Sequence, residues 1–340
     1  MLLPRRLLLG QFLCLSLCLL GPGCSSESSV EVVQPATPQG NGENSRTPAN
    51  KGTIGYSAMT LKNPFFKVIA DELTKEARQH GFDVVVSDAD DKLENQAKHV
   101  DNYIAQGMTA IVLNPVDRIA VGPIIKKAND AGIPVFTCDL ECEAEGIQVA
   151  GHVGTDNYQG GKLAGEAMVK ALGEAGGDVL VLALPEKNSC VLRVIGFKEV
   201  LDAHNAGREN GKINIVAELP CGGLRDPAHK ATGDSLQQYP NLRGIFAIND
   251  PAALGAWKAL SQAGKAEQVT IVGFDGQMEG KQAIKEGKIF ADPIQFPERM
   301  GQLTALAIAA HLNGDDYEAH VLIPTELYDK ATADADPALQ

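Results

Sequence analysis

The sequence predicts an α/β protein of two lobes, each built on a parallel sheet that helices cover on both faces. Apolar strands alternate with amphipathic helices along the chain, and the alternation occurs in two successive series. Strands that are apolar along nearly their whole length are typical of buried parallel sheets. A length of 340 residues agrees with about two domains. Two series in one chain therefore indicate two similar lobes.

The first series of elements lies within residues 53–150. Apolar runs predict strands at 53–57, 82–86, 110–113, 134–137 and 148–150. Helical periodicity predicts a helix that begins at Pro64, followed by helices at 93–106 and 119–131. Pro64 suits a first helical turn, and Asn63 before it suits an N-cap.

The second series begins near residue 158. Helices are predicted at 158–172, 191–203, 227–238, 251–263, 279–286 and 298–312. The intervening strands are predicted at 178–182, 213–216, 244–247, 269–272 and 289–291. The tail over 331–340 shows no apolar period, and we expect it to be disordered.

Polar side chains follow several of the predicted strands directly. These residues are Asn63, Asp139, Asn249 with Asp250, Asp275 and Gln295. Each alone is equally well explained as a helix N-cap. Ligands of open parallel sheets bind beyond the carboxyl ends of the strands, so the set together favours a binding site. Carboxylate and amide groups with nearby aromatic rings suit a polyhydroxylated ligand.

The N-terminus has the pattern of a processing segment. Arg5 and Arg6 precede an apolar run at 7–20 that is too short to span a bilayer, so residues 1–23 are expected to be a signal peptide. Small residues before Cys24 favour lipidation of that cysteine, with plain secretion as the alternative. Residues 24–50 would then form a lipidated flexible tether. The formal net charge of −13 argues against nucleic-acid binding.

With these motifs the chain resembles the periplasmic sugar-binding proteins of ABC transporters, of the ribose-, galactose- and allose-binding type. The resemblance runs from about residue 52 to residue 328. It is carried by these motifs: Asn63-Pro64-Phe65-Phe66, Asn114-Pro115, Thr155-Asp156-Asn157, Asn249-Asp250 and Val272-Gly273-Phe274-Asp275-Gly276.

The resemblance implies two Rossmann-like lobes joined by a three-segment hinge, the type I periplasmic-binding-protein fold. The first lobe would comprise 51–154 plus 296–323, and the second lobe 155–295 plus 324–330. It also implies ligand contacts at these positions: Asn63, Phe65, Phe66, Asp139, Arg193, Asn249, Asp275 and Gln295.

The implied function is capture of a monosaccharide, such as a ribose-like pentose, a hexose or a polyol, and its delivery to an ABC permease. A sugar-sensing receptor for signalling or chemotaxis is the alternative. We expect a monomer in the periplasm or cell envelope that meets the membrane only through its lipid anchor. Three departures from the ribose pattern leave the sugar open: Leu140 replaces an arginine, Gly223 an aromatic residue and Met59 a small hydroxyl residue.

Other chemistries find little support in the sequence. It contains no Gly-x-Ser-x-Gly, phosphate-loop or His-Glu-x-x-His motif, so we expect no enzyme, no cofactor and no metal. His152 and His229 are interpreted as surface or hinge residues. A disulfide between Cys190 and Cys221 is a hypothesis, since an oxidising envelope permits one, and four free buried thiols are the alternative. Cys138 and Cys142 are a second candidate pair.

Overall fold

The computed structural model describes residues 50–340. The predicted signal peptide at 1–23, the lipidation site Cys24 and all of the predicted tether except Asn50 lie outside the described residues. Among the residues that the structure does describe, no helix is long and apolar enough to cross a membrane. The described chain folds around two parallel sheets, which confirms the predicted α/β class.

The sheet of the first lobe has six strands in the order β11-β5-β4-β3-β1-β2, and all its pairs are parallel. Its strands are β1 Gly52–Ala58, β2 Phe82–Asp88, β3 Ala110–Leu113, β4 Val135–Cys138, β5 Gly151–Thr155 and β11 His320–Ile323. The edge strand β11 comes from far along the chain and pairs in parallel with β5.

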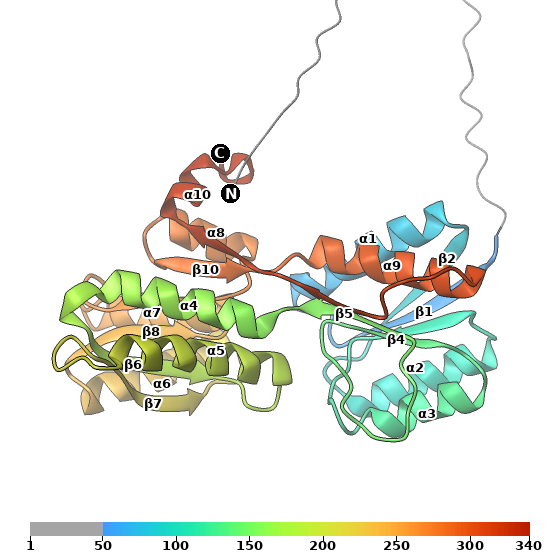
Figure 1. Cartoon of the computed structure of the whole chain (residues 1–340), viewed down its shortest axis with the longest axis horizontal. Coiled ribbons are helices and arrows are strands. Elements are labelled where there is room, and N and C mark those ends of the chain that lie inside the picture. Colours follow the sequence, from blue (N-terminus) through green and yellow to red (C-terminus); the bar gives the residue numbers. More distant parts are fainter. Residues whose placement is uncertain (1–49) are drawn as a thin grey trace, which may run out of the picture. The chain divides into compact units, whose positions relative to one another are not determined.

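Helices cover both faces of this first sheet. They are α1 Pro64–Gln79, α2 Leu93–Ala105, α3 Gly122–Asp130 and α9 Pro297–Asn313. α1 and α9 lie side by side (Figure 1) and share one apolar cluster with the sheet, while α2 and α3 share another. Alternation along β3 sends Val112 into the first cluster and Ile111 into the second.

Helix α1 shows why the local sequence folds as it does. Asn63 is its N-cap and accepts a hydrogen bond from the backbone N–H of Phe65, and Pro64 occupies the first turn. Ile69, Leu73 and Ala77 recur at helical spacing and are all buried. The predicted cap, first turn and apolar face of this helix are therefore confirmed.

The second lobe has a six-stranded sheet in the order β12-β10-β9-β8-β6-β7, and only the pair β10–β12 is antiparallel. Its strands are β6 Gly177–Ala183, β7 Ile213–Pro220, β8 Leu242–Ala247, β9 Thr270–Val272, β10 Ala291–Ile294 and β12 Glu326–Asp329.

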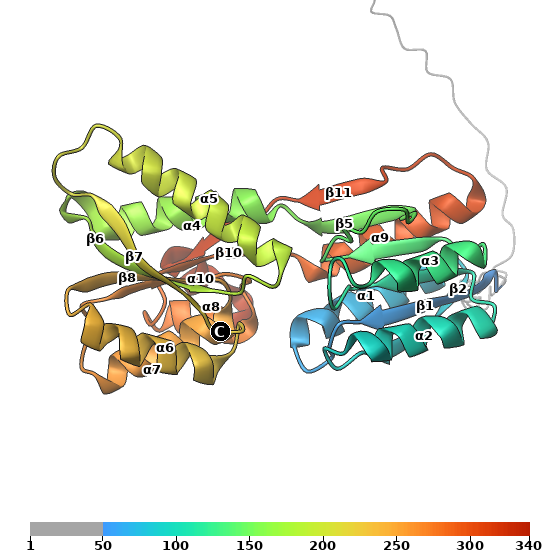
Figure 2. The same cartoon turned by 90° about the horizontal axis from the view of Figure 1, so that it is seen from below.

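The second sheet is also covered on both faces. Its helices are α4 Asn157–Leu172, α5 Asn188–Asn205, α6 Arg225–Gln238, α7 Asp250–Gln262, α8 Met278–Lys285 and α10 Lys330–Ala335. Figure 2 shows α4 and α5 together on one side of the strands and α6 and α7 together on the other. Separate apolar clusters fill the two sides.

The chain passes from one sheet to the other three times. The first passage connects β5 to α4, the second connects β10 to α9, and the third connects β11 to β12. Thr155 Oγ1 at the first passage donates to Oε1 of Gln295 at the second, over 2.6 Å. The backbone N–H of Thr325 at the third passage donates to Oε1 of Gln159, which lies in α4, over 3.0 Å. The three passages are therefore tied to one another.

The prediction that the tail over 331–340 is disordered is wrong. Residues 330–335 form α10, and the carboxylate of Asp329 caps it by accepting from the backbone N–H of Thr332. Ala333 is fully buried, and the hydroxyl of Tyr328 donates to Oδ2 of Asp336 over 2.7 Å. One buried alanine and two carboxylate acceptors order a segment too short to show a helical period.

Several other boundaries differ from the predicted ones, and two of these shifts lie in the first lobe. The strand predicted at 148–150 is instead β5, which begins at Gly151, and the helix predicted from residue 119 begins at Gly122. The carboxylate of Asp117 explains the second shift, because it accepts from the backbone N–H groups of Ile119 and Ala120 and forms a turn there.

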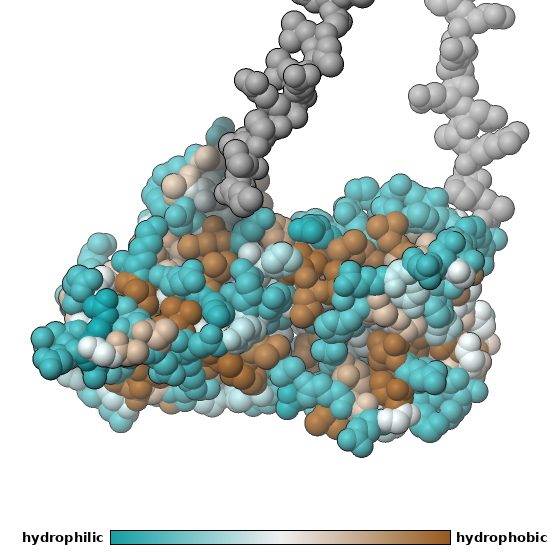
Figure 3. Space-filling model, viewed as in Figure 1, coloured by the Kyte–Doolittle hydropathy of each residue, from teal (hydrophilic) through white to brown (hydrophobic). Residues whose placement is uncertain are grey.

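Hydrophilic residues cover most of the face drawn in Figure 3, with apolar residues interspersed.

Candidate functional site

Three of the predicted ligand contacts meet in one buried polar group. Arg193 from α5 donates through Nη1 to Oδ1 of Asp275, which follows β9, over 3.0 Å. Gln295, which follows β10, donates through Nε2 to the same oxygen over 2.6 Å. All three are buried, and Arg193 is only 4 % exposed. A charge that is this deeply buried requires full pairing.

Arg193 is held from several directions. Its Nε donates to Oδ1 of Asn157 over 2.8 Å, and its Nη1 also donates to the carbonyl oxygen of Ile248 over 2.6 Å. The guanidinium carbon lies 3.9 Å from the ring centroid of Phe274. We did not predict roles for Asn157 and Phe274, although both lie in motifs that carry the family resemblance. These contacts fix the guanidinium before any ligand arrives.

Asp275 occupies an unusual backbone position. Its φ is +98°, and its backbone N–H donates to the carbonyl oxygen of Pro293 over 3.1 Å. Burial raises the pKa of its carboxyl, and Arg193 opposes the rise by favouring the charged form. The backbone bridge to the end of β10 thus places this carboxyl against Arg193 and Gln295.

Asp139 comes from the first lobe, directly after β4. Its backbone N–H donates to the carbonyl oxygen of Val153 over 2.9 Å, and its φ is +66°. Burial raises the pKa of the Asp139 carboxyl to about 7, Arg193 lowers it and the charge of Asp275 raises it. Charges of the second lobe therefore act on this carboxyl of the first lobe. Within the described residues no hydrogen bond reaches its side-chain oxygens, which leaves them open to a ligand's hydroxyl groups.

The predicted aromatic pair lies at the start of α1. The rings of Phe65 and Phe66 pack edge to face, with centroids 5.3 Å apart and an interplanar angle of 88°. Both belong to the apolar cluster under α1, and they keep 6 % and 7 % of their surfaces exposed. Asn63 beside them accepts at Oδ1 from Nε2 of Gln277, in the second lobe, over 3.3 Å. The rings therefore both pack in the core and border the polar contact between the lobes.

The N-cap alternative holds at two of the predicted positions. Asn63 caps α1, and Asn249 caps α7 by accepting from the backbone N–H of Ala252 over 3.0 Å. Asp139, Asp275 and Gln295 cap no helix. These three side chains are thus not explained by helix capping.

The backbone conformation of the loop after β7 explains why position 223 holds glycine and not an aromatic residue. Its φ is +65°, which favours glycine, and an added Cβ would lie 2.8 Å from Nδ2 of Asn249. Asn249 donates to the carbonyl oxygen of this glycine over 3.0 Å. Leu140 and Met59, the other two departures, are buried in the apolar cluster of the first lobe. None of the three positions supplies a polar group to the site.

The structure does not form the predicted bond between Cys190 and Cys221. All four described cysteines, which include Cys138 and Cys142, are free thiols. Cys190 packs in the apolar cluster under α4 and α5, and Cys221 packs in the cluster under α6 and α7. The sheet lies between the two clusters, so both thiols are core residues on opposite faces.

Two further hydrogen bonds join residues of the two lobes near the strand ends. Nζ of Lys187 donates to the carbonyl oxygen of Val116 over 2.6 Å, and Nη1 of Arg118 donates to Oδ1 of Asn188 over 3.2 Å. Val116 and Arg118 lie in the loop after β3, Lys187 lies in the loop after β6, and Asn188 begins α5. Polar groups from both lobes thus converge at the carboxyl ends of the strands, where open parallel sheets bind ligands.

Residues 54–316 match the family described as periplasmic binding protein domain. This chain belongs to that family. It is 33 % identical over 277 residues to the ribose import binding protein RbsB of Salmonella typhimurium, with 82 % of this chain and 90 % of the relative covered. It is 35 % identical over 233 residues to the D-apiose import binding protein of Paraburkholderia graminis, with 68 % of this chain and 72 % of the relative covered.

Solved structures of similar fold agree with this membership. An ABC transporter solute-binding protein from Actinobacillus succinogenes with bound D-allose matches with a TM-score of 0.77 at 28 % identity, covering 84 % of this chain and 100 % of that one. A solute-binding protein from Mycobacterium smegmatis with bound glycerol matches with a TM-score of 0.75 at 32 % identity, covering 84 % and 96 %. The predicted resemblance and the type I periplasmic-binding-protein fold are confirmed.

Proposed function

We propose that this protein is the substrate-binding component of an ABC sugar importer and holds a monosaccharide or a polyol between its two lobes. The observation that carries the proposal is a pair of buried carboxyls that follow strands, Asp139 of the first lobe and Asp275 of the second. The guanidinium of Arg193 donates to Asp275 over 3.0 Å and also lowers the pKa of Asp139. A neutral ligand rich in hydroxyl groups can donate to both carboxylates and accept from the guanidinium.

The binding roles follow from the chemistry of each side chain. Asp139 accepts hydroxyl protons, because its oxygens have no other donor among the described residues. Asp275 has Arg193 and Gln295 on one oxygen, Oδ1, and presents its other oxygen to the ligand. Asn63 and Asn249 add amide groups, and the rings of Phe65 and Phe66 face the C–H surfaces of a sugar.

The three apolar positions narrow the ligand class. Leu140, Met59 and Gly223 add no hydrogen-bond donor or ring, so the pocket is less polar than that of a ribose binder. We propose a larger sugar, a deoxy sugar or a polyol as the ligand. Relatives with the same fold hold D-allose and glycerol in their solved structures, a range that agrees with this class.

Further proposals concern the setting of the protein. We infer that it has no catalytic activity, that it acts as a monomer and that it delivers its ligand to a permease. Lipidation of Cys24 would anchor it in the cell envelope, with residues 25–50 as the tether.

Calorimetry against a panel of pentoses, hexoses, deoxy sugars and polyols tests the function, and Asp139→Asn tests the site. Asparagine tolerates the positive φ at this position and keeps the shape of the side chain. We expect the tightest ligand to lose about 10–100-fold in affinity, the cost of a lost hydrogen bond to a charged group. Asp101→Asn, an exposed carboxylate of the same lobe, is the matched control and should bind as the wild type does. A panel without any binder, or unchanged affinity in Asp139→Asn, contradicts the proposal.

A further inference from the structure

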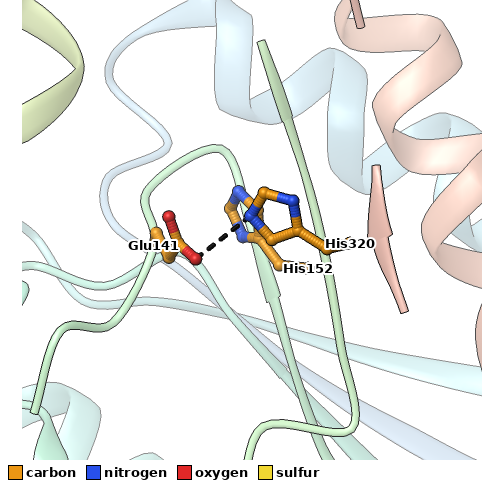
Figure 4. A group of neighbouring side chains, drawn as sticks. All are labelled: Glu141, His152 and His320. Carbon is orange, nitrogen blue, oxygen red and sulfur yellow. Dashed lines mark hydrogen bonds and ion pairs between the residues drawn. The ribbon is translucent and has the colours of Figure 1, made fainter. Parts of the chain in front are cut away.

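A group of three metal-ligating side chains lies apart from the ligand site, at the edge of the first sheet. His152 is on β5, His320 is on the edge strand β11, and Glu141 follows β4. One ligand atom of each lies within 4.8 Å of the other two. Figure 4 shows the three side chains pointing toward one another.

The sheet register brings the two histidines together. His320 pairs directly with His152 in the parallel ladder between β11 and β5, so both side chains leave the same face of the sheet. Their ring centroids lie 5.3 Å apart. Oε1 of Glu141 lies 3.1 Å from Nε2 of His320. Donor atoms around a tetrahedral Zn²⁺ ion lie roughly 3.3 Å apart, given metal–ligand bonds of about 2.0–2.1 Å.

A hydrogen bond from a neighbouring strand orients the buried histidine, His152. Oγ1 of Thr137, on β4, lies 2.9 Å from Nδ1 of His152, which leaves Nε2 as the nitrogen available to a metal. Metal-bound histidines commonly use their other ring nitrogen in this way. The strand also makes room for the ring, because a Cβ at Gly154 would lie 2.7 Å from Nε2 of His152.

The other two side chains provide a path for the ion. His320 has 51 % of its side-chain surface exposed, and Glu141 has 48 %. Two imidazoles with one carboxylate are a donor set that suits Zn²⁺ and related divalent transition metals more than Ca²⁺ or Mg²⁺, which prefer oxygen ligands. Three protein ligands leave the fourth position of a tetrahedral ion for water.

We propose that Glu141, His152 and His320 form a binding site for a divalent transition metal of the Zn²⁺ class. Bound metal would fasten the edge strand β11 to β5 and to the loop after β4. β5 and β11 each lead into a passage between the sheets, so the metal would stiffen the first lobe where the chain leaves it.

Zinc titration of the chelator-treated full-length protein tests the site and requires no sugar. We expect the wild type to bind one Zn²⁺ ion more than His320→Ala does, and Glu141→Gln to weaken this ion's binding at least 10-fold. Both positions are half-exposed, so the variants should fold. His80→Ala is the matched control, since His80 also lies 3.1 Å from a glutamate, Glu76, but has no third ligand within residues 50–340. Identical titrations of wild type and His320→Ala would overturn the proposal.

Cysteine ligation is the competing explanation, because Cys142 adjoins Glu141. Cys142→Ser should retain the ion, and Co²⁺ in place of Zn²⁺ should give a spectrum without a thiolate charge-transfer band. Loss of the ion in Cys142→Ser, or such a band in the wild type, would overturn the assigned ligands. Thr137→Val should weaken binding about 10–100-fold by releasing the ring of His152, as loss of an outer-shell partner does in other metal sites.

Discussion

Two buried carboxyls of the second lobe stand out at the scale of single residues. Asp250, in the first turn of α7, and Asp292, on β10, are buried, and neither oxygen of Asp292 has a hydrogen-bond partner within the described residues. Burial, and then the charge of Asp292, raise the pKa of Asp250 well above its usual range. Burial raises the pKa of Asp292 to about 6. Because both pKa values are raised in the folded protein, ionisation of either carboxyl costs the fold stability.

The pair Asp250 and Asp292 makes the free energy of unfolding depend on pH, and the raised pKa values give the sign of that dependence. A carboxyl whose pKa is raised in the folded state holds its proton more tightly there, so stability falls as pH rises from about 4 through about 6. Asp292→Asn removes this loss. We expect the free energy of unfolding of the variant to equal that of the wild type near pH 4 and to exceed it by on the order of 3 kcal/mol above pH 6. Urea unfolding across this pH range measures the difference.

The control for this prediction is Asp234→Asn, an exposed carboxylate that pairs with Lys230. Its effect should stay within about 0.5 kcal/mol at every pH. Parallel pH curves for the wild type and Asp292→Asn would mean that Asp292 is no less acidic in the folded protein than in the unfolded chain.

At the scale of elements, the contact between α4 and α5 depends on glycine. A Cβ at Gly161 of α4 would lie 2.1 Å from the carbonyl oxygen of Arg193, and one at Gly196 of α5 would lie 2.2 Å from the carbonyl oxygen of Tyr158. The two backbones therefore approach more closely than any side chain allows. This approach places Arg193 at the polar centre of the candidate site.

Gly161→Ala should separate the two helices. We expect a loss of about 1–3 kcal/mol in the free energy of unfolding, as overpacking usually costs, and weaker ligand binding because Arg193 moves with α5. Gly233→Ala in α6 is the control, since a Cβ there meets nothing within 4 Å. It should instead gain about 0.5–1 kcal/mol from helix propensity. Equal effects of the two substitutions in denaturant unfolding would contradict the close contact.

The sequence predicted elements that carry their own signal and missed those defined by distant partners. The apolar runs of β1, β3 and β8 and the cap of α1 are local, and each was predicted. β11, β12 and α10 were missed because β11 and β12 are four residues long with one buried residue each, and α10 contributes a single buried alanine.

The candidate site divides in the same way. Asp139, Asp275 and Gln295 follow strands directly, so their positions could be predicted, although the roles assigned to them remain predictions. The role of Asn157 depends on the approach of α5, and the grouping of Glu141 with His320 depends on β11 lying beside β5. No local sequence pattern predicts that residues so far apart in the chain lie together.

At the scale of the whole molecule, the side chain of Gln295 connects the passages between the sheets to the site. Gln295 accepts from the hydroxyl of Thr155 and donates to Oδ1 of Asp275. Thr155 ends β5 of the first sheet, and Gln295 follows β10 of the second. A change in the backbone conformation of the segments that connect the sheets would therefore move the carboxyl of Asp275.

Thr155→Val tests this connection while keeping the shape of the side chain. The buried Oε1 of Gln295 loses its donor, which costs about 1–3 kcal/mol, and the freed amide no longer holds Asp275. We expect lower stability and weaker ligand binding together. Thr304→Val in α9 is the control, because its hydroxyl donates to the helix carbonyl of Met300 and touches no passage. It should leave ligand affinity unchanged.

A double-mutant cycle separates this connection from a local defect. If Gln295 transmits the effect, Thr155→Val should cost less ligand affinity in a Gln295→Leu background than in the wild type, because the transmitting amide is already gone. Calorimetry of the four proteins gives the coupling directly. Additive losses would show that Thr155 and Gln295 act independently, and the passages would then stabilise the lobes without reaching the ligand.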